Sequence, residues 1–502
     1  MEIGTYFSLG VYFIVMLGIG FYAYRTNEES ASGYLLGGRK LSAPVTALSA
    51  GASDMSGWML MGVPGAMYVA GASSLWIVFG LCIGAWLNYT IVAPRLRVFT
   101  EQANDSITLP DFFENRFFDT SHSLRIVASI VIIIFFTVYT SSGVVAGGKL
   151  FESSFGLGYH WGVLITAGVV VAYTLIGGFM AVSLTDFVQG CIMFIALILV
   201  PTVVMFELGG VNSTLTALSE INPDLLSLVK SADTGQTIGF VAIVSLMSWG
   251  LGYFGQPHII VRFMAIESVE QIPVARRIGM SWMIVALAGA AMTGLFGLAY
   301  ATKNNIQIQD SETIFILLSQ LLFHPLIGGF LLAAILAAIM STISSQLLVT
   351  SSSLTRDFYI SFLDKNASEK TQVLVGRVSV LLVSIVAILL AFGENKTILS
   401  LVSHAWAGFG AAFGPLVLFM LLWREVTQKA ALAGIISGAL TVLVWIYAPL
   451  SDNPDSIFNS LYAIIPGFLV SSAVIYGVGK CSTNKNQQVY DLFDNYRANL
   501  KG

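Results

Sequence analysis

Asp54 is an acidic residue inside a stretch that is otherwise uncharged. Residues 48–65 read LSAGASDMSGWMLMGVPG, with four glycines and one proline around this carboxylate. Glycine and proline are poor helix formers, so the composition predicts an interrupted helix. An aspartate at the centre of a membrane helix costs about 2.5–3.5 kcal/mol, which favours a role for Asp54 in balancing a cation. In the alternative interpretation, the carboxylate bonds to neighbouring serines and only caps the helix break.

Two further segments carry groups that could hold a cation or a solute. Residues 245–258 read SLMSWGLGYFGQPH, and their three glycines and one proline predict a second interrupted helix. Residues 332–346 read LAAILAAIMSTISSQ, where Ser341 and Thr342 place adjacent hydroxyls in an alanine-rich helix that a neighbour can approach closely. Carbonyl and hydroxyl oxygens are hard ligands, which suit a cation such as sodium. Alternatively, both hydroxyls bond back to their own helix.

The remaining candidate residues have simpler interpretations. Asp186 follows Gly177-Gly178, a pattern typical of a helix stop and then an N-cap, and Arg39 is first a basic anchor. Most aromatic residues of membrane proteins pack or form interface belts, and this applies to Trp58, Tyr139, Trp249 and Tyr253. The sequence contains no His/Cys metal-ligand spacing, phosphate-binding loop or nucleophile elbow. Enzyme chemistry and ATP-driven transport therefore have no candidate site.

The composition determines the environment of these segments. The chain has 502 residues, of which 56% are hydrophobic and 10% are charged, and its mean hydropathy is +0.80. Soluble domains carry about 25% charged residues, so this chain cannot cover a globular surface with polar groups. The net charge of −4 gives no reason to expect nucleic-acid binding. The first apolar stretch lacks a preceding basic region, which favours a first membrane span over a cleaved signal peptide.

Apolar runs and their polar breaks predict thirteen membrane spans, each long enough to cross a hydrocarbon core of about 30 Å. The spans lie at residues 6–24, 42–70, 74–94, 126–148, 160–180, 186–207, 238–256, 278–301, 325–350, 376–393, 398–421, 429–448 and 459–479. An odd number of spans places the two termini on opposite sides of the membrane. With the N-terminus outside, twenty of the 24 lysines and arginines fall on the inside, as the positive-inside rule requires.

The two interrupted helices are spans 2 and 7, and they divide the chain into repeats. A spacing of five spans inverts the second set of five relative to the first, which is the pattern of inverted-repeat transporters. The predicted organisation is a first span and inside loop at 1–41, repeats at 42–207 and 238–421 separated by an outside loop at 208–237, two further spans at 422–479 and a cytoplasmic tail at 480–502.

Five runs of sequence carry a family resemblance: LSAGASDMSGWM at 48–59, IGGFMAVSLTDF at 176–187, SWGLGYFGQPHII at 248–260, AAILAAIMSTIS at 333–344 and AWAGFGAAFGPL at 405–416. With these runs the chain resembles the sodium/proline symporters of the bacterial sodium:solute symporter family over nearly its whole length. The resemblance implies an all-α polytopic membrane protein with a leucine-transporter-type core of five plus five inverted helices.

The resemblance also implies specific site residues. A sodium site would be formed by the carbonyls of Ala52, Met55 and Ala338 and the hydroxyls of Ser341 and Thr342. Asp54 would be required for sodium dependence, and Asp186 and Arg39 match positions linked to ion coupling and inward-side gating. Proline would lie between spans 2, 4 and 7, near Ser56, Trp58, Gly62, Tyr139, Trp249, Tyr253 and Pro257.

The sequence thus predicts a transporter of the bacterial inner membrane, not an enzyme, that couples sodium to proline uptake by alternating access. Its predicted partners are sodium, proline and the lipid bilayer, with no nucleic acid and no obligatory protein partner. One alternative is a symporter of the same family for another solute. A second alternative is a channel or a membrane sensor, although a sensor should carry a sizeable soluble output domain and the sequence has no segment long enough for one.

Overall fold

The computed structural model describes residues 3–26, 36–364, 366–393, 397–448, 456–482 and 486–500. Most of the predicted inside loop after the first span, at 27–35, lies outside the described residues, as do residues 483–485 and 501–502 of the predicted tail. The described residues form helices, and their only ladder contacts are two isolated bridges, Leu41 with Ile266 and Lys230 with Thr237. The prediction of an all-α protein is confirmed.

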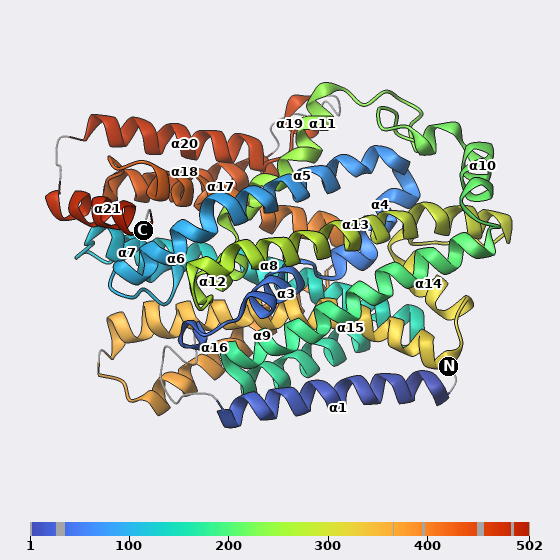
Figure 1. Ribbon diagram of the computed structural model, residues 1–502, viewed down its shortest axis with the longest axis horizontal. Helices are drawn as coiled ribbons and strands as arrows, with labels where there is room; N and C mark the ends of the chain where they lie inside the picture. The colour runs from blue at the N-terminus through green and yellow to red at the C-terminus, as the bar shows by residue number, and fades with distance from the viewer. Residues whose placement is uncertain are drawn as a thin grey trace.

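Long helices lie side by side along the long axis of the molecule (Figure 1). They are α1 (Ile3–Thr26), α8 (Ser123–Phe155), α9 (Tyr159–Glu207), α13 (Ile272–Lys303), α15 (Pro325–Ser352), α16 (Glu369–Ala391), α17 (Ile398–Leu422), α18 (Gln428–Tyr447) and α20 (Ile464–Cys481). By length and composition, ten helices in the described residues could cross a membrane. Shorter apolar helices cover Tyr159–Ala172 and Phe240–Gly255, and the count of thirteen spans stays a prediction.

The shorter elements gather at the two ends of the bundle and within its interrupted helices. At the end that carries the C-terminus, left in Figure 1, lie α6 (Ala93–Gln102), α7 (Leu109–Phe117) and α21 (Gln487–Asn499). At the opposite end lies α10 (Val211–Ile221). We call these the α21 end and the α10 end. The remaining connecting elements are η1 (Gly37–Arg39), η3 (Gly71–Ser74), η5 (Pro223–Leu226), η7 (Val269–Gln271), η8 (Ser311–Thr313), α14 (Ile314–Leu321), η9 (Ser353–Leu363) and α19 (Ile457–Ser460).

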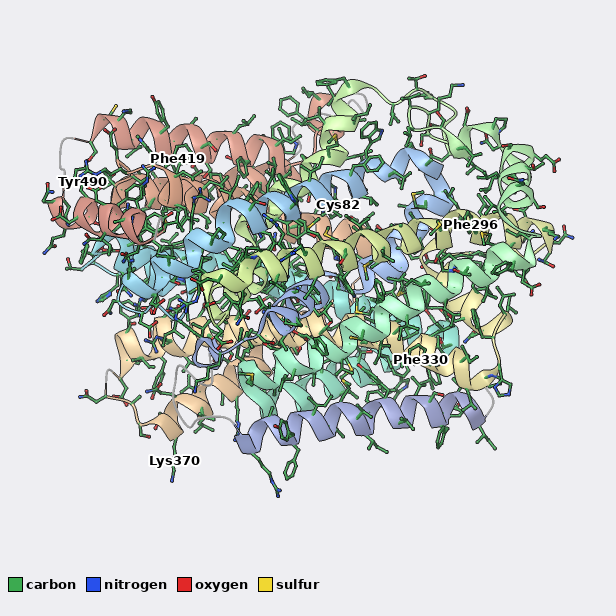
Figure 2. The ribbon with its side chains drawn as sticks, in the orientation of Figure 1. Cys82, Phe296, Phe330, Lys370, Phe419 and Tyr490 are labelled. Atoms are coloured by element: carbon green, nitrogen blue, oxygen red, sulfur yellow. The ribbon has the colours of Figure 1, made fainter. Side chains whose placement is uncertain are left out.

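The outer surface of the bundle is apolar. On α16, Leu382, Ile385 and Leu389 are each more than half exposed although all are hydrophobic. Exposed apolar surface on this scale indicates contact with lipid. Lys370 and Tyr490 both lie at the α21 end (Figure 2). The described residues therefore have the surface pattern of a multi-pass membrane protein.

The predicted break in the second span is present. Helix α3 (Ala43–Asp54) ends at Met55, whose backbone angles of φ −83° and ψ 79° leave the helical region. The chain resumes as a π-helical turn, η2 (Trp58–Gly62), and continues as α4 (Val63–Ala70) with Pro64 in its first turn. Proline is tolerated in the first turn because the missing amide donor there has no helical partner in any case. The glycines and proline therefore separate α3 from α4.

The seventh span is interrupted in the same way. Helix α11 (Phe240–Met247) passes into a 3-10 segment, η6 (Ser248–Gly255), and Pro257 then starts α12 (Pro257–Ala265). A third break lies within α9, where Gly178 adopts φ 61° and ψ −174°, backbone angles that favour glycine. This confirms the helix stop predicted at the glycine pair and separates predicted spans 5 and 6.

Glycines allow η6 to pack closely against the third span. That span consists of α5 (Leu75–Leu87), the π-helical turn η4 (Asn88–Val92) and α6. A methyl group at Gly80 would lie 2.2 Å from the carbonyl oxygen of Met247, and one at Gly84 would lie 2.1 Å from that of Gly250. The two backbones are therefore too close for any side chain at these positions. Small residues four positions apart on a helix allow such an approach.

We predict that Gly84→Val lowers the stability of the purified protein by about 1–3 kcal/mol, because the added methyl groups must push the two backbones apart. The measurement is thermal unfolding in detergent, followed by intrinsic fluorescence. Gly18→Val on α1 is the matched control, since no atom lies within 4 Å of a methyl group at that glycine. Equal unfolding temperatures for the two variants would contradict the close approach of α5 and η6.

Candidate functional site

The break in α3 faces the hydroxyl pair of α15. The hydroxyl of Ser341 donates across the helix contact to the carbonyl oxygen of Ala52, 2.7 Å away, and also lies 3.1 Å from the carbonyl of Ala338 on its own helix. The hydroxyl of Thr342 lies 3.4 Å from the same Ala52 carbonyl. Back-bonding to α15 is therefore present for Ser341, but both hydroxyls also reach α3.

This contact exists because α3 ends where it does. In a continuous helix the carbonyl of Ala52 would accept the amide of Ser56, but that amide donates to the carbonyl of Asp54, 3.0 Å away. A buried carbonyl without a backbone partner must find another donor, and the hydroxyls of α15 supply it. Met55, the fifth predicted ligand, is the residue at which the chain leaves the helix.

The resulting cluster is chemically suited to a hard monovalent cation. Its contacting atoms are neutral carbonyl and hydroxyl oxygens, all within the buried interior. Such oxygens are ligands that hard cations prefer over soft transition metals. The described residues contain no group of three or more His, Cys, Asp or Glu side chains that could hold a metal ion.

The carboxylate of Asp54 points away from this cluster. Its Oδ2 accepts a hydrogen bond of 2.5 Å from the hydroxyl of Tyr253 on η6, and its Oδ1 has no hydrogen-bond partner among the described residues. The residue is 2% exposed. Burial of a charged group is costly unless the group is paired, and the salt bridges of the described residues do not include Asp54. Asp54 is thus a buried acid without a cationic partner among the described residues.

Several of the residues predicted to bind the solute surround the same break. The indole of Trp58 donates to the backbone carbonyl of Asp54 at 2.9 Å, and the hydroxyl of Tyr139 on α8 lies 3.4 Å from that carbonyl. The hydroxyl of Ser56 lies 3.4 Å from the amide of Trp58. The side chains of Trp58 on η2 and Tyr139 on α8 therefore both contact the backbone carbonyl of Asp54 at the end of α3.

The other predicted solute residues lie around this point. Trp249 stacks on Tyr462 with ring centroids 5.3 Å apart, and its carbonyl accepts the indole of Trp406 at 2.7 Å. Trp406 in turn contacts Tyr253 edge to face at 5.2 Å. Gly62 lies one turn beyond Trp58 on η2, and Pro257 is the buried first residue of α12. The sequence analysis did not select Trp406, although it lies in the AWAGFGAAFGPL run.

Asp186 is not an N-cap, and that interpretation was wrong. It lies within the second part of α9, is 0% exposed and pairs with Arg262 of α12 at 3.1 Å. Its Oδ2 also accepts the hydroxyl of Ser49 on α3 at 2.8 Å. Arg262 follows the predicted span at 238–256 and is thus one of the twenty basic residues predicted on the inside. In the structure, however, it is 1% exposed and also donates to Ser345 of α15 at 2.6 Å. One buried ion pair thus joins α3, α9, α12 and α15.

Arg39 ties the start of α3 to the α21 end of the bundle. Its guanidinium forms a 2.8 Å ion pair with Asp105 and donates to the carbonyls of Met264 and Ser106 at 2.6 and 2.8 Å. Burial lowers the pKa of Arg39 below its ordinary value, and the carboxylate of Asp105 opposes this shift. Arg39 is therefore more than a surface anchor, because it connects η1 with the last turn of α12 and the α6–α7 loop.

The sequence analysis missed a second buried contact of this kind. Glu312 on η8 pairs with Lys149 of α8 at 2.7 Å and accepts the amides of Ile398 and Leu399 at 3.0 and 3.3 Å. The free amides of a helix start favour an acid there, and α17 begins at Ile398. Because η8 and α17 are distant in sequence, no local motif marked Glu312 as a partner of that helix.

Two solved structures share the fold of this chain. A sodium-coupled sialic acid symporter in a substrate-bound outward-open state matches with a TM-score of 0.81 at 18% identity, covering 97% of this chain and 99% of that one. The nucleobase-cation-symport-1 transporter Mhp1 in a closed conformation matches with a TM-score of 0.54 at 12% identity, covering 92% and 98%. The chain therefore has the leucine-transporter-type fold.

The chain belongs to the sodium:solute symporter family, whose family model matches residues 34–438. Sodium/proline symporter 2 of Staphylococcus saprophyticus is 55% identical over 502 residues, covering 99% of this chain and 96% of that protein. The osmoregulated proline transporter OpuE of Bacillus subtilis is 54% identical over 493 residues, covering 98% of each. The protein is thus a multi-pass membrane symporter of this family.

We predict that Asp186→Asn destabilises the protein by about 3–5 kcal/mol, because Arg262 would keep a buried charge without its partner. Thermal unfolding of the purified variant is the measurement. The double variant Asp186→Asn/Arg262→Met removes both charges and should recover part of the loss. A single variant as stable as the wild type, or a double variant less stable than the single one, would contradict the pairing.

Proposed function

We propose that this chain couples the inward movement of sodium to the uptake of L-proline across the bacterial inner membrane. Family membership and two relatives that are named as proline transporters support this proposal. The observation that carries it is the convergence of Ser341 and Thr342 on the released carbonyl of Ala52 at the break of α3.

The proposed sodium site consists of the carbonyls of Ala52, Met55 and Ala338 with the hydroxyls of Ser341 and Thr342. In the described structure the hydroxyl protons satisfy the Ala52 carbonyl, which holds α15 against α3. A sodium ion would take over this role, because the hydroxyl and carbonyl oxygens can all turn their lone pairs toward it. Binding of the ion would therefore fix the position of α3 relative to α15.

The proposed proline site lies on the continuation of the same broken helix. Ser56, Trp58 and Gly62 belong to the break and to η2, while Tyr139, Trp249, Tyr253 and Pro257 come from α8, η6 and α12. The solute would thus contact residues that directly follow the ion ligands of α3. Two ligands that stabilise one arrangement of a shared element raise each other's affinity, as thermodynamic linkage requires.

Alternating access would follow from movement of the interrupted helices. We take residues 42–207 and 238–421 as the two inverted repeats, a division supported by breaks at α3–η2 and η6–α12. Arg39 at the α21 end is proposed as an inward-side gate, because it binds the last turn of α12. Asp186 is proposed to act in ion coupling through its contact with α3.

The α21 end is proposed to face the cytoplasm, with the N-terminus outside. The positive-inside distribution of lysine and arginine in the sequence supports this orientation. Lys370 and the C-terminal helix α21, both assigned to the inside, lie at the same end of the bundle (Figure 2).

The proposal is tested by uptake of labelled proline into proteoliposomes that contain the purified protein. An imposed inward sodium gradient should stimulate uptake, and a potassium gradient should not. Asp54→Asn, which keeps the shape of the side chain, should fold but lose the stimulation by sodium. Competition by other solutes in the same assay identifies another cargo. Uptake that is equally fast without sodium, or sodium-stimulated uptake that is normal in Asp54→Asn, would contradict the proposed coupling.

We predict that Ser341→Ala and Thr342→Ala both raise the sodium concentration needed for half-maximal uptake. Removing one polar group that contacts a charged partner costs about 1.5–3 kcal/mol, which corresponds to a roughly 10- to 150-fold higher sodium concentration for half-maximal uptake. Ser344→Ala is the matched control, because the hydroxyl of Ser344 bonds back to the carbonyl of Ser341 within α15. An unchanged sodium requirement in both variants, with normal amounts of protein in the membrane, would assign the pair a purely structural role.

A further inference from the structure

A small cavity with a mainly apolar lining lies on the face of α3 opposite the hydroxyl pair. Its α3 wall includes Ala47, Gly51 and Asp54, residues that recur at helical spacing on one face. The facing wall includes Asn88 of η4 and Gly279 of α13. The cavity has about 20 Å³ of space that the centre of a water molecule can occupy. A volume of about 10–15 Å³ by this measure is enough for one water molecule.

Two buried side chains meet this cavity with unused hydrogen-bonding capacity. Asn88 is 1% exposed, and within the described part of the chain neither its amide oxygen nor its amide nitrogen has a hydrogen-bond partner. The Oδ1 atom of Asp54 is also buried and has no partner among these residues. An unsatisfied buried polar group costs about 1–3 kcal/mol, and more if it is charged. Two such groups lining one cavity of sufficient volume indicate a bound water molecule rather than two separate defects.

The local backbone places Asn88 in this position. Asn88 is the first residue of the π-helical turn η4, which precedes Pro94 near the start of α6. A π-helical turn inserts an extra residue into a helix and frequently occurs at functional sites. The neighbouring Tyr89 fits only because position 279 is a glycine, since a methyl group there would lie 2.7 Å from the tyrosine hydroxyl. Tyr89 and Gly279 thus pack closely at the wall of the cavity.

We propose that Asn88 is a positioning residue for Asp54 and acts through one water molecule bound in this cavity. The water donates to Oδ1 of Asp54 and exchanges hydrogen bonds with the amide of Asn88. Tyr253 holds Oδ2 of the same carboxylate at 2.5 Å. The two contacts fix both oxygens, and therefore the orientation of the acid at the break of α3. This role rests on the proposed sodium-coupled function.

The test uses two Asn88 variants with side chains of nearly equal shape. Asn88→Val removes all hydrogen bonding, whereas Asn88→Thr keeps a hydroxyl that can bind the water. Asn88→Leu is a second apolar variant in case Asn88→Val does not fold. Thr46→Val is the matched control, because Thr46 is a buried residue of α3 with an unpartnered hydroxyl that does not line the cavity. Each variant is purified, and its thermal unfolding is recorded.

Two readouts follow for each variant. The first is the sodium concentration needed for half-maximal proline uptake, together with proline affinity at saturating sodium. The second is the sodium-minus-potassium infrared difference spectrum, in which the band of the Asp54 carboxyl group is identified by its loss in Asp54→Asn. The infrared readout does not depend on transport, so it decides the role of Asn88 even if the wild type proves to carry another solute.

The apolar variant should need about 5- to 30-fold more sodium than Asn88→Thr, the expected effect of losing a water-mediated bond to a charged group. Its Asp54 band should be shifted, while unfolding temperature and proline affinity at saturating sodium stay close to those of the wild type. Thr46→Val should behave like the wild type. Equal sodium requirements and an unmoved Asp54 band in the valine and threonine variants would overturn the proposal. So would a spectrum without an Asp54 band, or uptake reduced equally at all sodium concentrations.

Discussion

The structure depends on the interruption of helix α3 at Met55. There the amide of Ser56 turns to the carbonyl of Asp54, and the carbonyl of Ala52 loses its place in the helical ladder. Buried carbonyls need donors, and these are supplied by other helices. The hydroxyl of Ser341 on α15 donates a hydrogen bond to the carbonyl of Ala52, and the indole of Trp58 donates one to the carbonyl of Asp54. The break is thus the point at which separate parts of the bundle are joined.

The same break explains why the proposed ion and solute sites are separate but adjacent. The proposed ion ligands come from the end of α3 and from α15. The proposed solute residues Ser56, Trp58 and Gly62 follow α3 in the chain, and the others come from α8, η6 and α12. An ordinary helix would satisfy its own carbonyls and offer neither site. Movement of α3 relative to α15 changes both sites together, which is the physical basis for coupling in this account.

The two buried acids near α3 differ in how their charge is compensated. Asp186 is paired with Arg262 and bonded to Ser49, so its interactions link four helices in a fixed arrangement. Asp54 has a tyrosine hydroxyl on one oxygen and no partner from the described chain on the other. A buried carboxylate without a counter-charge is sensitive to any nearby cation. This difference favours Asp54 as the acid that responds to sodium.

Sequence reasoning located the features that depend on local composition. The breaks after Asp54 and before Pro257 follow from clustered glycine and proline, and the hydroxyls of Ser341 and Thr342 stand out in an apolar helix. Partners that are distant in sequence could not be found in this way. Arg262 resembled a loop residue until the fold placed it against Asp186, 76 positions away. Asn88 lies in an ordinary apolar run, and only packing against α3 reveals its unused amide.

The identities of the ion, the solute and the backbone ligands were predicted from the resemblance to a known family and not from local chemistry. The identity of the ion and of the solute, and the roles of Ala52, Met55 and Ala338, are not encoded in any single residue type. Backbone carbonyls carry no sequence signature at all, because every residue has one. Their use as ligands depends on where the helix ends, and four of the five predicted ligands are in mutual contact in the structure.

If one broken helix serves both proposed sites, sodium must change the affinity for proline, and equilibrium binding of labelled proline to the purified protein measures this change. Replacing potassium by sodium should tighten proline binding about 5- to 150-fold, the range that typical coupling free energies give. Thr342→Ala should reduce this dependence at intermediate sodium, although Thr342 is not placed to touch proline. Proline binding that is equally tight with and without sodium would contradict the shared-helix account.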